Sequence, residues 1–332
     1  MGIKISQALW RIMMRTFCNK FWRLAKARIF SGFFLLVNLK SKPKNSVELA
    51  SITIYRISVI MSKPTVRPKK PKIVFFDIDD TLYIKHQERV PQSAIEALKQ
   101  LKQQGIMVAI ATGRGRAVFP KAVYELIETV GIDVLVTING QCSHHQGELL
   151  AHYPMTPAQI KLITDYVESN NLSYAYMTDA EIIALAEDEA LSEALNSLKI
   201  AYRTARHDDI DLSIPIYQVV AFHPDNTQVN FEFPSTLKIM RWHKNGIDIL
   251  DATGSKARGI AQALNKLGLD FEDAMAFGDG VNDIEMLQTV GFGVAMGNAH
   301  ADVKAAADYV CPAAWEDGIY QGLQNLGLLP HG

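Results

Sequence analysis

The chain has 332 residues, of which 48% are hydrophobic and 21% are charged, so it is long enough for one large or two ordinary folded domains. This composition excludes a disordered chain, and 21 Gly with 13 Pro exclude a collagen-like or low-complexity protein. The formal net charge of −1 favours neither a nucleic-acid-binding protein nor a strongly acidic one. We therefore expect no nucleic-acid partner.

Cysteine usage and hydropathy bear on where the protein functions. Cys18, Cys142 and Cys311 have no paired spacing, so they form neither a disulfide framework nor a zinc site, and we expect a reducing compartment, the cytoplasm. The longest apolar stretch, residues 29–39, would cross only about half of a bilayer. We expect a protein without a membrane span.

Residues 1–60 differ in composition from the rest of the chain. They hold eleven Lys or Arg and one acidic residue, so they carry +10 and the remaining residues carry −11. Aromatic residues lie among these charges, which suits a helix on an anionic lipid surface or a targeting presequence. The interpretation we favour is a basic extension outside the fold, because a strand pattern begins directly after the polar linker 61–72.

From residue 73 the chain alternates between strand and helix patterns. Ile73–Phe76 is a short apolar run, typical of a strand that is buried on both faces. A helix is expected from about Gln92 until Gly105 ends it, and further strands are predicted at 106–111 and 134–138. Alternation of this kind predicts a parallel sheet with helices on both faces.

The same alternation returns near residue 254. Ser255 is a suitable N-cap for a helix that Gly268 ends, and strands are predicted at 274–277 and 293–296. Between about 146 and 244, a helix-like segment (157–168) and short strand-like runs (173–177 and 217–222) indicate a smaller α+β unit. We therefore predict a doubly wound, Rossmann-like α/β core with an inserted α+β cap; the core comprises 73–145 and 245–332, and the cap 146–244.

Acidic motifs follow two of the predicted strands at their carboxyl ends, the edge where an open parallel sheet binds ligands. Asp77 and Asp79 follow the first strand at i, i+2 spacing, so both carboxylates can face one site. Asp279 and Asp283 lie in a glycine-flanked turn after a later strand. Neighbouring acids repel unless a cation or a reaction uses them, and a solvated acidic turn is the simpler alternative. Four convergent carboxylates suit Mg²⁺ better than zinc.

Other polar residues stand at the same predicted edge. Lys256 lies in the first turn of a helix, where an ammonium group is mildly unfavourable; it either offsets the carboxylates and holds a phosphate or is an ordinary surface lysine. Thr112 and the residues after it offer oxyanion donors, although Thr-Gly is also common turn chemistry. The residues that we predict to bind the substrate or its phosphate are Gly113, Arg114, Asn139, Gly140 and Asn282.

The pair His144-His145 raises the question of a second metal site. The sequence offers this pair no third ligand at a useful spacing. A hairpin between Cys142 and Gly147 explains these residues, so we expect no metal there.

Four motifs in order resemble the haloacid dehalogenase (HAD) superfamily of phosphatases: DIDDT at 77–81, TGR at 112–114, SK at 255–256 and GDGVND at 278–283. GVAMGNA at 293–299 and the insertion at 146–244 resemble its Cof-type branch, which has a large α/β cap. The resemblance covers residues 72–330 and does not extend to 1–60. Asp80 is a departure, because many relatives have glycine at this position, and its side chain adds negative charge near the site.

The resemblance implies a role for each matching residue. Asp77 matches the nucleophile that becomes an aspartyl phosphate, and Asp79 matches the general acid that protonates the leaving alcohol and then activates water. Thr112 and Lys256 match groups that hold the phosphoryl oxygens. The implied Mg²⁺ ligands are Asp77, Asp279, Asp283 and the backbone carbonyl of Asp79.

These observations together predict a Mg²⁺-dependent phosphomonoester hydrolase that acts on small phosphorylated metabolites, with sugar phosphates foremost. A phosphomutase that uses the same aspartyl phosphate is the enzymatic alternative. A non-enzymatic regulator that binds a phospholigand is the second alternative, but binding alone would not need a nucleophile and a paired acid.

Overall fold

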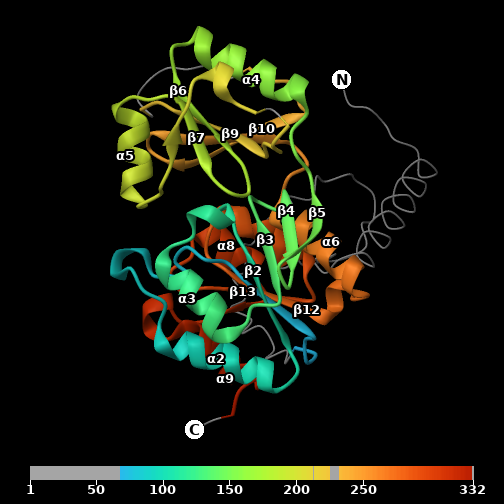
Figure 1. Cartoon of the computed structure of the whole chain (residues 1–332). Helices are drawn as coiled ribbons and strands as arrows, with labels where there is room; N and C mark the ends of the chain where they lie inside the picture. Colours follow the sequence, from blue (N-terminus) through green and yellow to red (C-terminus); the bar gives the residue numbers. More distant parts are fainter. Residues whose placement is uncertain (1–67, 212, 225–231, 331–332) are drawn as a thin grey trace, which may run out of the picture. The chain divides into compact units, whose positions relative to one another are not determined.

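The computed structural model describes residues 68–211, 213–224 and 232–330. The basic extension (1–60) and most of the linker (61–72) predicted from the sequence lie outside these residues. The described residues form two sheets with their helices (Figure 1). Short 3₁₀ helices occur at η1 (Lys85–Gln87), η2 (Arg116–Val118), η3 (His207–Asp209), η4 (Phe271–Asp273), η5 (Val281–Asp283) and η6 (Ala314–Glu316).

The larger sheet has eight strands in the order β14-β13-β12-β1-β2-β3-β4-β5. All neighbours from β14 to β3 are parallel, whereas β4 and β5 add an antiparallel hairpin at one edge. The strands are β1 (Ile73–Phe76), β2 (Met107–Ala111), β3 (Val134–Thr137), β4 (Cys142–His145), β5 (Glu148–His152), β12 (Ala274–Gly278), β13 (Phe292–Ala295) and β14 (Tyr309–Val310).

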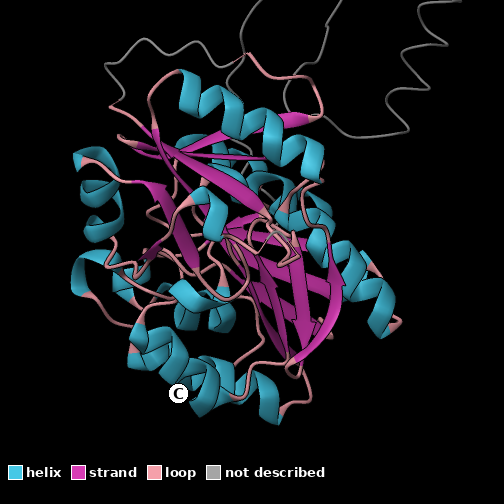
Figure 2. Ribbon diagram, turned by 45° about the horizontal axis from the view of Figure 1, so that its top comes forward, coloured by secondary structure: helices cyan, strands magenta, loops and turns pink. Residues whose placement is uncertain are grey.

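The central strand β1 buries alternate side chains on opposite faces of this sheet. Val74 and Phe76 pack into one apolar cluster with side chains of α2, α3 and α9. Ile73 and Phe75 pack into another with α6, α7 and α8, so helices cover both faces (Figure 2). These helices are α2 (Gln92–Gln103), α3 (Lys121–Val130), α6 (Lys256–Leu267), α7 (Ile284–Thr289), α8 (Ala301–Ala306) and α9 (Gly318–Asn325). The predicted doubly wound α/β core is confirmed.

The smaller sheet has six strands in the order β10-β11-β9-β6-β7-β8, antiparallel except for the pair β7 and β8. Helix α4 (Pro157–Ser169) packs on one face and α5 (Glu189–Ser197) on the other. We call each sheet with its helices a unit. The α5 face of the smaller unit also buries Val118, Ile138 and Cys142 of the larger unit. The strands are β6 (Ser173–Met177), β7 (Ile182–Ala186), β8 (Arg203–Thr204), β9 (Gln218–Phe222), β10 (Leu237–His243) and β11 (Gly246–Asp251).

The chain changes from one sheet to the other a few residues later than the sequence patterns indicate. β5 continues the hairpin of β4 and so belongs to the larger sheet, which moves the first change from 146 to after His152. β11 pairs with β9 and β10, which moves the second change from 245 to after Asp251. A strand that joins a sheet through a hairpin carries no local signal of which sheet it joins.

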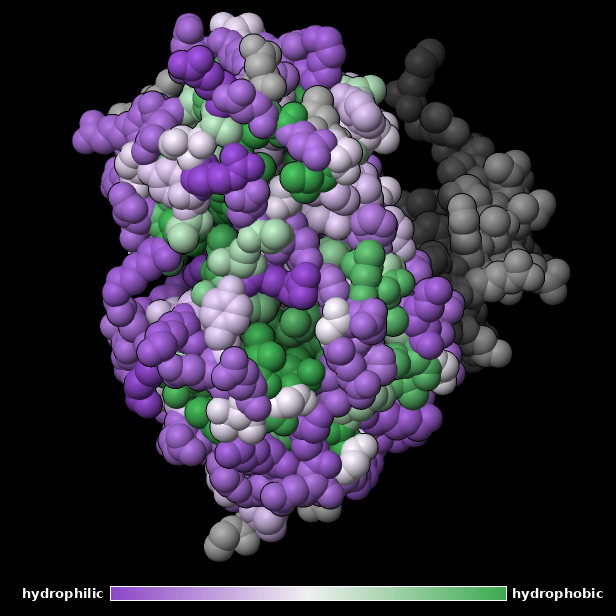
Figure 3. All heavy atoms as spheres, in the orientation of Figure 1, coloured by the Kyte–Doolittle hydropathy of each residue, from purple (hydrophilic) through white to green (hydrophobic). Residues whose placement is uncertain are grey.

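The described residues include no helix that is long and apolar enough to cross a membrane. On the face drawn in Figure 3, hydrophobic side chains show in patches among hydrophilic ones.

Candidate active site

Three carboxylates meet at the carboxyl ends of two adjacent strands. Asp77 follows β1, whereas Asp279 and Asp283 follow β12, its parallel neighbour. One oxygen from each of the three side chains lies within 4.8 Å of the others, and Asp77 and Asp283 are buried. The structure therefore brings together two acidic motifs that lie about 200 residues apart in the sequence.

The turn after β12 aims Asp283 at this cluster. Its carboxylate accepts hydrogen bonds from the backbone N–H groups of Asp279 (3.0 Å) and Gly280 (2.9 Å). A Cβ atom on Gly278 would lie 2.5 Å from the carboxyl carbon of Asp283, so a side chain at this position would displace the acid. The two glycines in this motif thus allow the close turn that the paired carboxylates need.

Lys256 lies between the carboxylates as the compensating charge. Its ammonium group is 2.6 Å from an oxygen of Asp77 and 2.6 Å from an oxygen of Asp283, and its side chain is only 1% exposed. The predicted capping is observed: the Ser255 hydroxyl accepts the N–H of Arg258 at the start of α6, and Gly268 ends the helix with φ of 68°. The alternative of an ordinary surface lysine is excluded by this burial.

Burial and mutual repulsion shift the pKa values of the cluster. Burial raises the pKa of Asp77, and the neighbouring carboxylates raise it further, while Lys256 offsets only part of this effect. Burial would lower the pKa of Lys256, but the charges of Asp283 and Asp77 outweigh it and raise this pKa. Burial, then Asp283 and Asp80, raise the pKa of Asp279 to about 7. The cluster carries more negative charge than a single lysine balances.

The donor set of this cluster fits a small, hard divalent cation. Asp77, Asp279 and Asp283 offer carboxylate oxygens, the ligands that Mg²⁺ prefers, and their excess negative charge is what a cation would neutralise. The carboxylate of Asp79 is directed elsewhere and is not in the group. That Asp79 contributes its backbone carbonyl to the metal site stays a prediction.

Asp79 forms a two-pronged ion pair with Arg114. Both oxygens of Asp79 lie 2.8 Å from nitrogens of the guanidinium, which also donates to the carbonyl of Val118. Burial would raise the pKa of Asp79, but the hydrogen bonds and charge of Arg114 outweigh burial and lower it. Arg114 was expected to bind the substrate phosphate; in this structure it instead holds Asp79 in the ionised form.

The remaining residues predicted to bind phosphate lie on neighbouring loops. Buried Thr112 accepts the N–H of Arg114 (3.2 Å) through its hydroxyl. The Asn282 amide donates to the side-chain oxygen of Asn139 (3.2 Å), and a Cβ atom on Gly113 would lie 3.2 Å from that oxygen. Gly113, Asn139 and Asn282 thus lie next to one another.

A left-handed turn after β3 presents these groups. Ile138, Asn139 and Gly140 have φ values of 52°, 50° and 77°, and a left-handed β-branched residue such as Ile138 is uncommon. The N–H of Ile138 donates to the carbonyl of Arg114 and the N–H of Asn139 to that of Thr112, both at 3.0 Å. Gly140 packs on the start of α6, where a Cβ atom would lie 1.9 Å from the carbonyl of Ser255. Gly140 therefore has a packing role against the helix that carries Lys256.

Two neighbours of the cluster were not predicted as site residues. The Asn298 amide donates to the backbone carbonyl of Asp80 (2.9 Å) and to Asp279 (3.3 Å), and the Thr81 hydroxyl donates to Asp279 (3.3 Å). Asn298 belongs to the GVAMGNA motif, which was the available signal. Asp80 has φ of 57°, a conformation suited to glycine, and its carboxylate pairs with Lys85 at 2.9 Å.

His144 lies in the expected hairpin, with Gln146 and Gly147 at its turn. A third residue approaches it from the smaller sheet, so Cys142, His144 and Asp179 place one ligand atom each within 4.8 Å. However, Arg116 already binds both oxygens of Asp179. The fold thus supplies the third ligand atom that the sequence does not show, while the guanidinium charge disfavours a cation at this position; the absence of a metal here stays a prediction.

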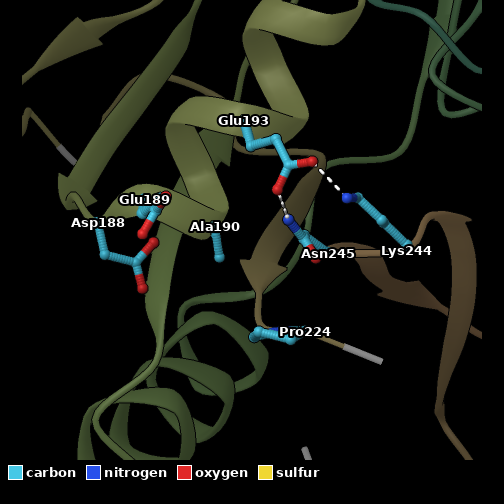
Figure 4. Close-up of a pocket in the computed structure, with 7 residues that line it drawn as sticks. All are labelled: Asp188, Glu189, Ala190, Glu193, Pro224, Lys244 and Asn245. Atoms are coloured by element: carbon cyan, nitrogen blue, oxygen red, sulfur yellow. Dashed lines mark hydrogen bonds and ion pairs between the residues drawn. The ribbon is translucent and has the colours of Figure 1, made fainter. Parts of the chain in front are cut away.

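A separate cavity of about 500 Å³ lies beside α5 (Figure 4). Its lining includes Asp188, Glu189 and Glu193, and Glu193 binds Lys244 (2.5 Å) and Asn245 (2.7 Å). None of the carboxylates around Lys256 lines this cavity.

Comparisons with known proteins agree with the geometry. The family model for haloacid dehalogenase-like hydrolases matches residues 74–323. The putative phosphatase YkrA of Bacillus subtilis is 33% identical over 260 residues, which cover 78% of this chain and 98% of that protein. The 5-amino-6-(5-phospho-D-ribitylamino)uracil phosphatase YwtE of Bacillus subtilis is 27% identical, with 77% of this chain and 98% of that protein covered.

Among solved structures, a HAD subclass IIB sugar phosphatase superposes with a TM-score of 0.69 and 29% identity, covering 78% of this chain and 100% of that one. The family match spans both halves of the larger sheet and the whole smaller sheet between them. The chain therefore belongs to the haloacid dehalogenase-like hydrolases, in the Cof-type branch that its motifs resemble.

Proposed function

We propose that this protein is a Mg²⁺-dependent phosphomonoester phosphatase that acts through an aspartyl phosphate. The observation that carries the proposal is the buried Lys256 between Asp77 and Asp283, with Asp279 completing a carboxylate cluster at the edge of the sheet. Burying a charge cluster of this kind costs stability, and carboxylates with pKa values shifted in this way are concentrated at binding and catalytic sites.

In the first half of the proposed reaction, a carboxylate oxygen of Asp77 attacks phosphorus. The bond from phosphorus to the leaving oxygen breaks, and that oxygen takes a proton from Asp79. In the second half, Asp79 accepts a proton from water, whose oxygen attacks the same phosphorus; phosphate leaves and Asp77 regains its carboxylate. The ion pair with Arg114 favours the ionised Asp79 that the second half requires, so Asp79 must leave this pair and take up a proton before it serves as the acid of the first half.

Lys256 and Thr112 are proposed to hold the phosphoryl oxygens, together with the backbone N–H of Gly113. Asn139 and Asn282 lie beside Gly113 and would orient the same group. Asp77, Asp279 and Asp283 would hold Mg²⁺. When bound, this ion supplies positive charge that reduces the repulsion between the carboxylates and the phosphate dianion.

The proposed substrates are small phosphorylated metabolites, with sugar phosphates first. A relative named for a phosphorylated ribityl compound and a structural neighbour named as a sugar phosphatase support this class. The smaller sheet and its helices would contact the leaving group and exclude water during the reaction. We further propose that the enzyme works in the cytoplasm, where such metabolites are found.

A phosphate-release assay tests the proposal. The panel is ribose 5-phosphate, glucose 6-phosphate, pyridoxal 5′-phosphate, adenosine monophosphate and p-nitrophenyl phosphate, each with Mg²⁺ and with a chelator. We expect Mg²⁺-dependent release from p-nitrophenyl phosphate and fastest turnover with one of the sugar phosphates. Lack of release from every compound would refute the proposal, and transfer of phosphate to a second sugar hydroxyl instead of water would identify a mutase.

A further inference from the structure

Two short segments connect the larger and smaller sheets. Residues 153–156 lead from β5 to α4, and residues 252–255 lead from β11 to α6. Arg258 in the first turn of α6 contacts both segments. Its guanidinium lies 4.1 Å from the ring centre of Tyr153 and donates to the hydroxyl of Thr253 at 2.6 Å. One side chain therefore joins the two connections.

Arg258 also binds a buried residue between these segments. It donates to the side-chain oxygen of Gln141, which is fully buried. The backbone carbonyl of Gln141 accepts the N–H of Tyr153 (2.7 Å), and its amide donates to the carbonyl of Tyr217 (3.3 Å), next to β9. Gln141 directly follows the left-handed turn of the candidate active site. The contacts of Arg258 thus reach from the two connecting segments to the residue that follows the turn at the candidate active site.

The arrangement uses properties that are specific to arginine. A planar guanidinium can stack on an aromatic ring while it donates hydrogen bonds in its own plane, which a lysine ammonium cannot do. Asp251 adds a charge partner at 3.7 Å, and the side chain is 20% exposed. The Nε of Arg258 is buried without a hydrogen-bond partner among the described residues.

Arg258 is close to the catalytic charge in the same helix. It lies two residues after Lys256, and its N–H is the group that Ser255 caps at 3.1 Å. The two connecting segments therefore meet at the first turn of α6. We propose that Arg258 is a positioning residue of the hinge: it holds both connections on the start of α6 and so limits the smaller unit to orientations that serve the reaction.

The hinge part of this inference is independent of the reaction, whereas its effect on turnover rests on the proposed function. Arg258→Ala is compared with Arg258→Lys and with Arg203→Ala as a matched control. Arg203 is a more exposed arginine that pairs with Glu181 within the smaller unit at 2.7 Å. Arg258→Lys keeps the positive charge but loses the planar fork, so it provides a second variant if the alanine variant does not fold.

Hydrogen exchange measures the hinge directly. Three backbone amides serve as reporters. The N–H of Tyr153 donates to the carbonyl of Gln141, and the N–H groups of Thr253 and Gly254 donate to the side chain and the carbonyl of Asp251. In Arg258→Ala we expect exchange at these amides to be about tenfold faster, in Arg258→Lys partly faster, and in Arg203→Ala unchanged. Exchange unchanged from the wild type in both Arg258 variants would overturn the proposal.

Kinetics measure the effect on turnover. Acetyl phosphate has a small leaving group that needs no general acid, whereas the fastest sugar phosphate of the panel has one large enough to reach the smaller unit. In Arg258→Ala we expect kcat for the sugar phosphate to fall about tenfold with less change in KM, and kcat for acetyl phosphate to fall less than about threefold. An equal loss for both compounds would indicate only damage to α6 and would overturn the positioning role.

The two parts fail in different ways. If the wild-type protein releases no phosphate from any compound, the proposed function is wrong and hydrogen exchange alone decides the role of Arg258. If the wild type is active but the reporter amides do not respond, the proposed function stands and the hinge is refuted.

Discussion

The carboxylate cluster and the contacts between the two units are built from different kinds of ion pair. In the cluster, Lys256 is 1% exposed and Asp283 is fully buried. Between the units, Lys199 pairs with Glu88 at 2.5 Å, but the two side chains are 70% and 56% exposed. Removing one partner of a buried ion pair lowers the free energy of unfolding by about 3–5 kcal/mol, whereas an exposed pair contributes about 1 kcal/mol or less. The charges of the cluster are thus held in place by burial, whereas this exposed pair contributes little to holding the two units together.

Removing a charge from the buried cluster should have the largest effect on activity. Asp77→Asn should lower kcat/KM for phosphate release at least about a thousandfold, or roughly 4 kcal/mol in barrier height, because the amide is a poor nucleophile and a weaker cation ligand. Asp165→Asn is the control, since Asp165 is an exposed acid paired with Lys161 on α4. Retention of more than about a tenth of wild-type activity would contradict the role of Asp77.

Replacing Asp79 separates the effect on metal binding from the effect on proton transfer. Asp79→Asn should lower kcat by about 10²–10³ and leave Mg²⁺ affinity nearly unchanged, because the Asp79 side chain binds Arg114 and not the cluster. Isothermal titration with Mg²⁺ and a phosphate-release assay measure the two effects separately. A large loss of Mg²⁺ affinity would show instead that the Asp79 side chain is a ligand.

Sequence patterns could predict the cluster but not its surroundings. Asp77, Asp279 and Lys256 each stand directly after a strand or at the start of a helix, so local patterns locate them at one edge of a parallel sheet. The pairing of Asp79 with Arg114 depends on a fork geometry that only the folded loops create. The contact of Asp179 with Arg116 likewise joins loops 63 residues apart and has no local signal.

In the fold too, local patterns predict some features, whereas others depend on long-range pairing. Strand and helix bounds followed from apolar runs and from glycine stops, as in α6, which ends at Gly268. The chain changes sheets after β5 and β11, several residues beyond the cap bounds predicted from the sequence, because pairing with a neighbour, and not local pattern, decides which sheet a hairpin strand joins.

The charge excess of the cluster predicts that metal binding depends on pH. The pKa of Asp279 is raised to about 7, so this side chain is largely protonated at pH 6 and ionised at pH 8. Mg²⁺ must displace that proton, and its affinity should be about tenfold weaker at pH 6 than at pH 8. Calorimetric titration at both pH values measures this ratio. Asp80→Asn removes a charge that raises the pKa, so its ratio should be smaller; equal ratios in the two proteins would contradict the assignment.

A partly buried pair between the units gives a smaller and pH-dependent effect. Arg116→Ala leaves the carboxylate of Asp179 beside His144, whose Nε2 lies 3.5 Å away. Burial, then the charge of Arg116, lower the pKa of His144, so removing Arg116 raises this pKa and lets the imidazole take up a proton at low pH. We expect Tm to fall by about 2–4 °C at pH 8 and by less at pH 6. A larger fall at pH 6 would contradict the coupling.

The exposed pair should have the smallest effect of all. Lys199→Ala breaks the contact with Glu88, but both side chains remain solvated and their charges are screened by salt. We expect an unchanged Tm and a kcat/KM within about twofold of the wild type. Glu88→Gln removes the same pair from the other side and should behave alike. If either variant lost as much activity as Arg258→Ala, the exposed contacts would also control the orientation of the smaller unit, and exposure would no longer distinguish the ion pairs that matter for activity from those that do not.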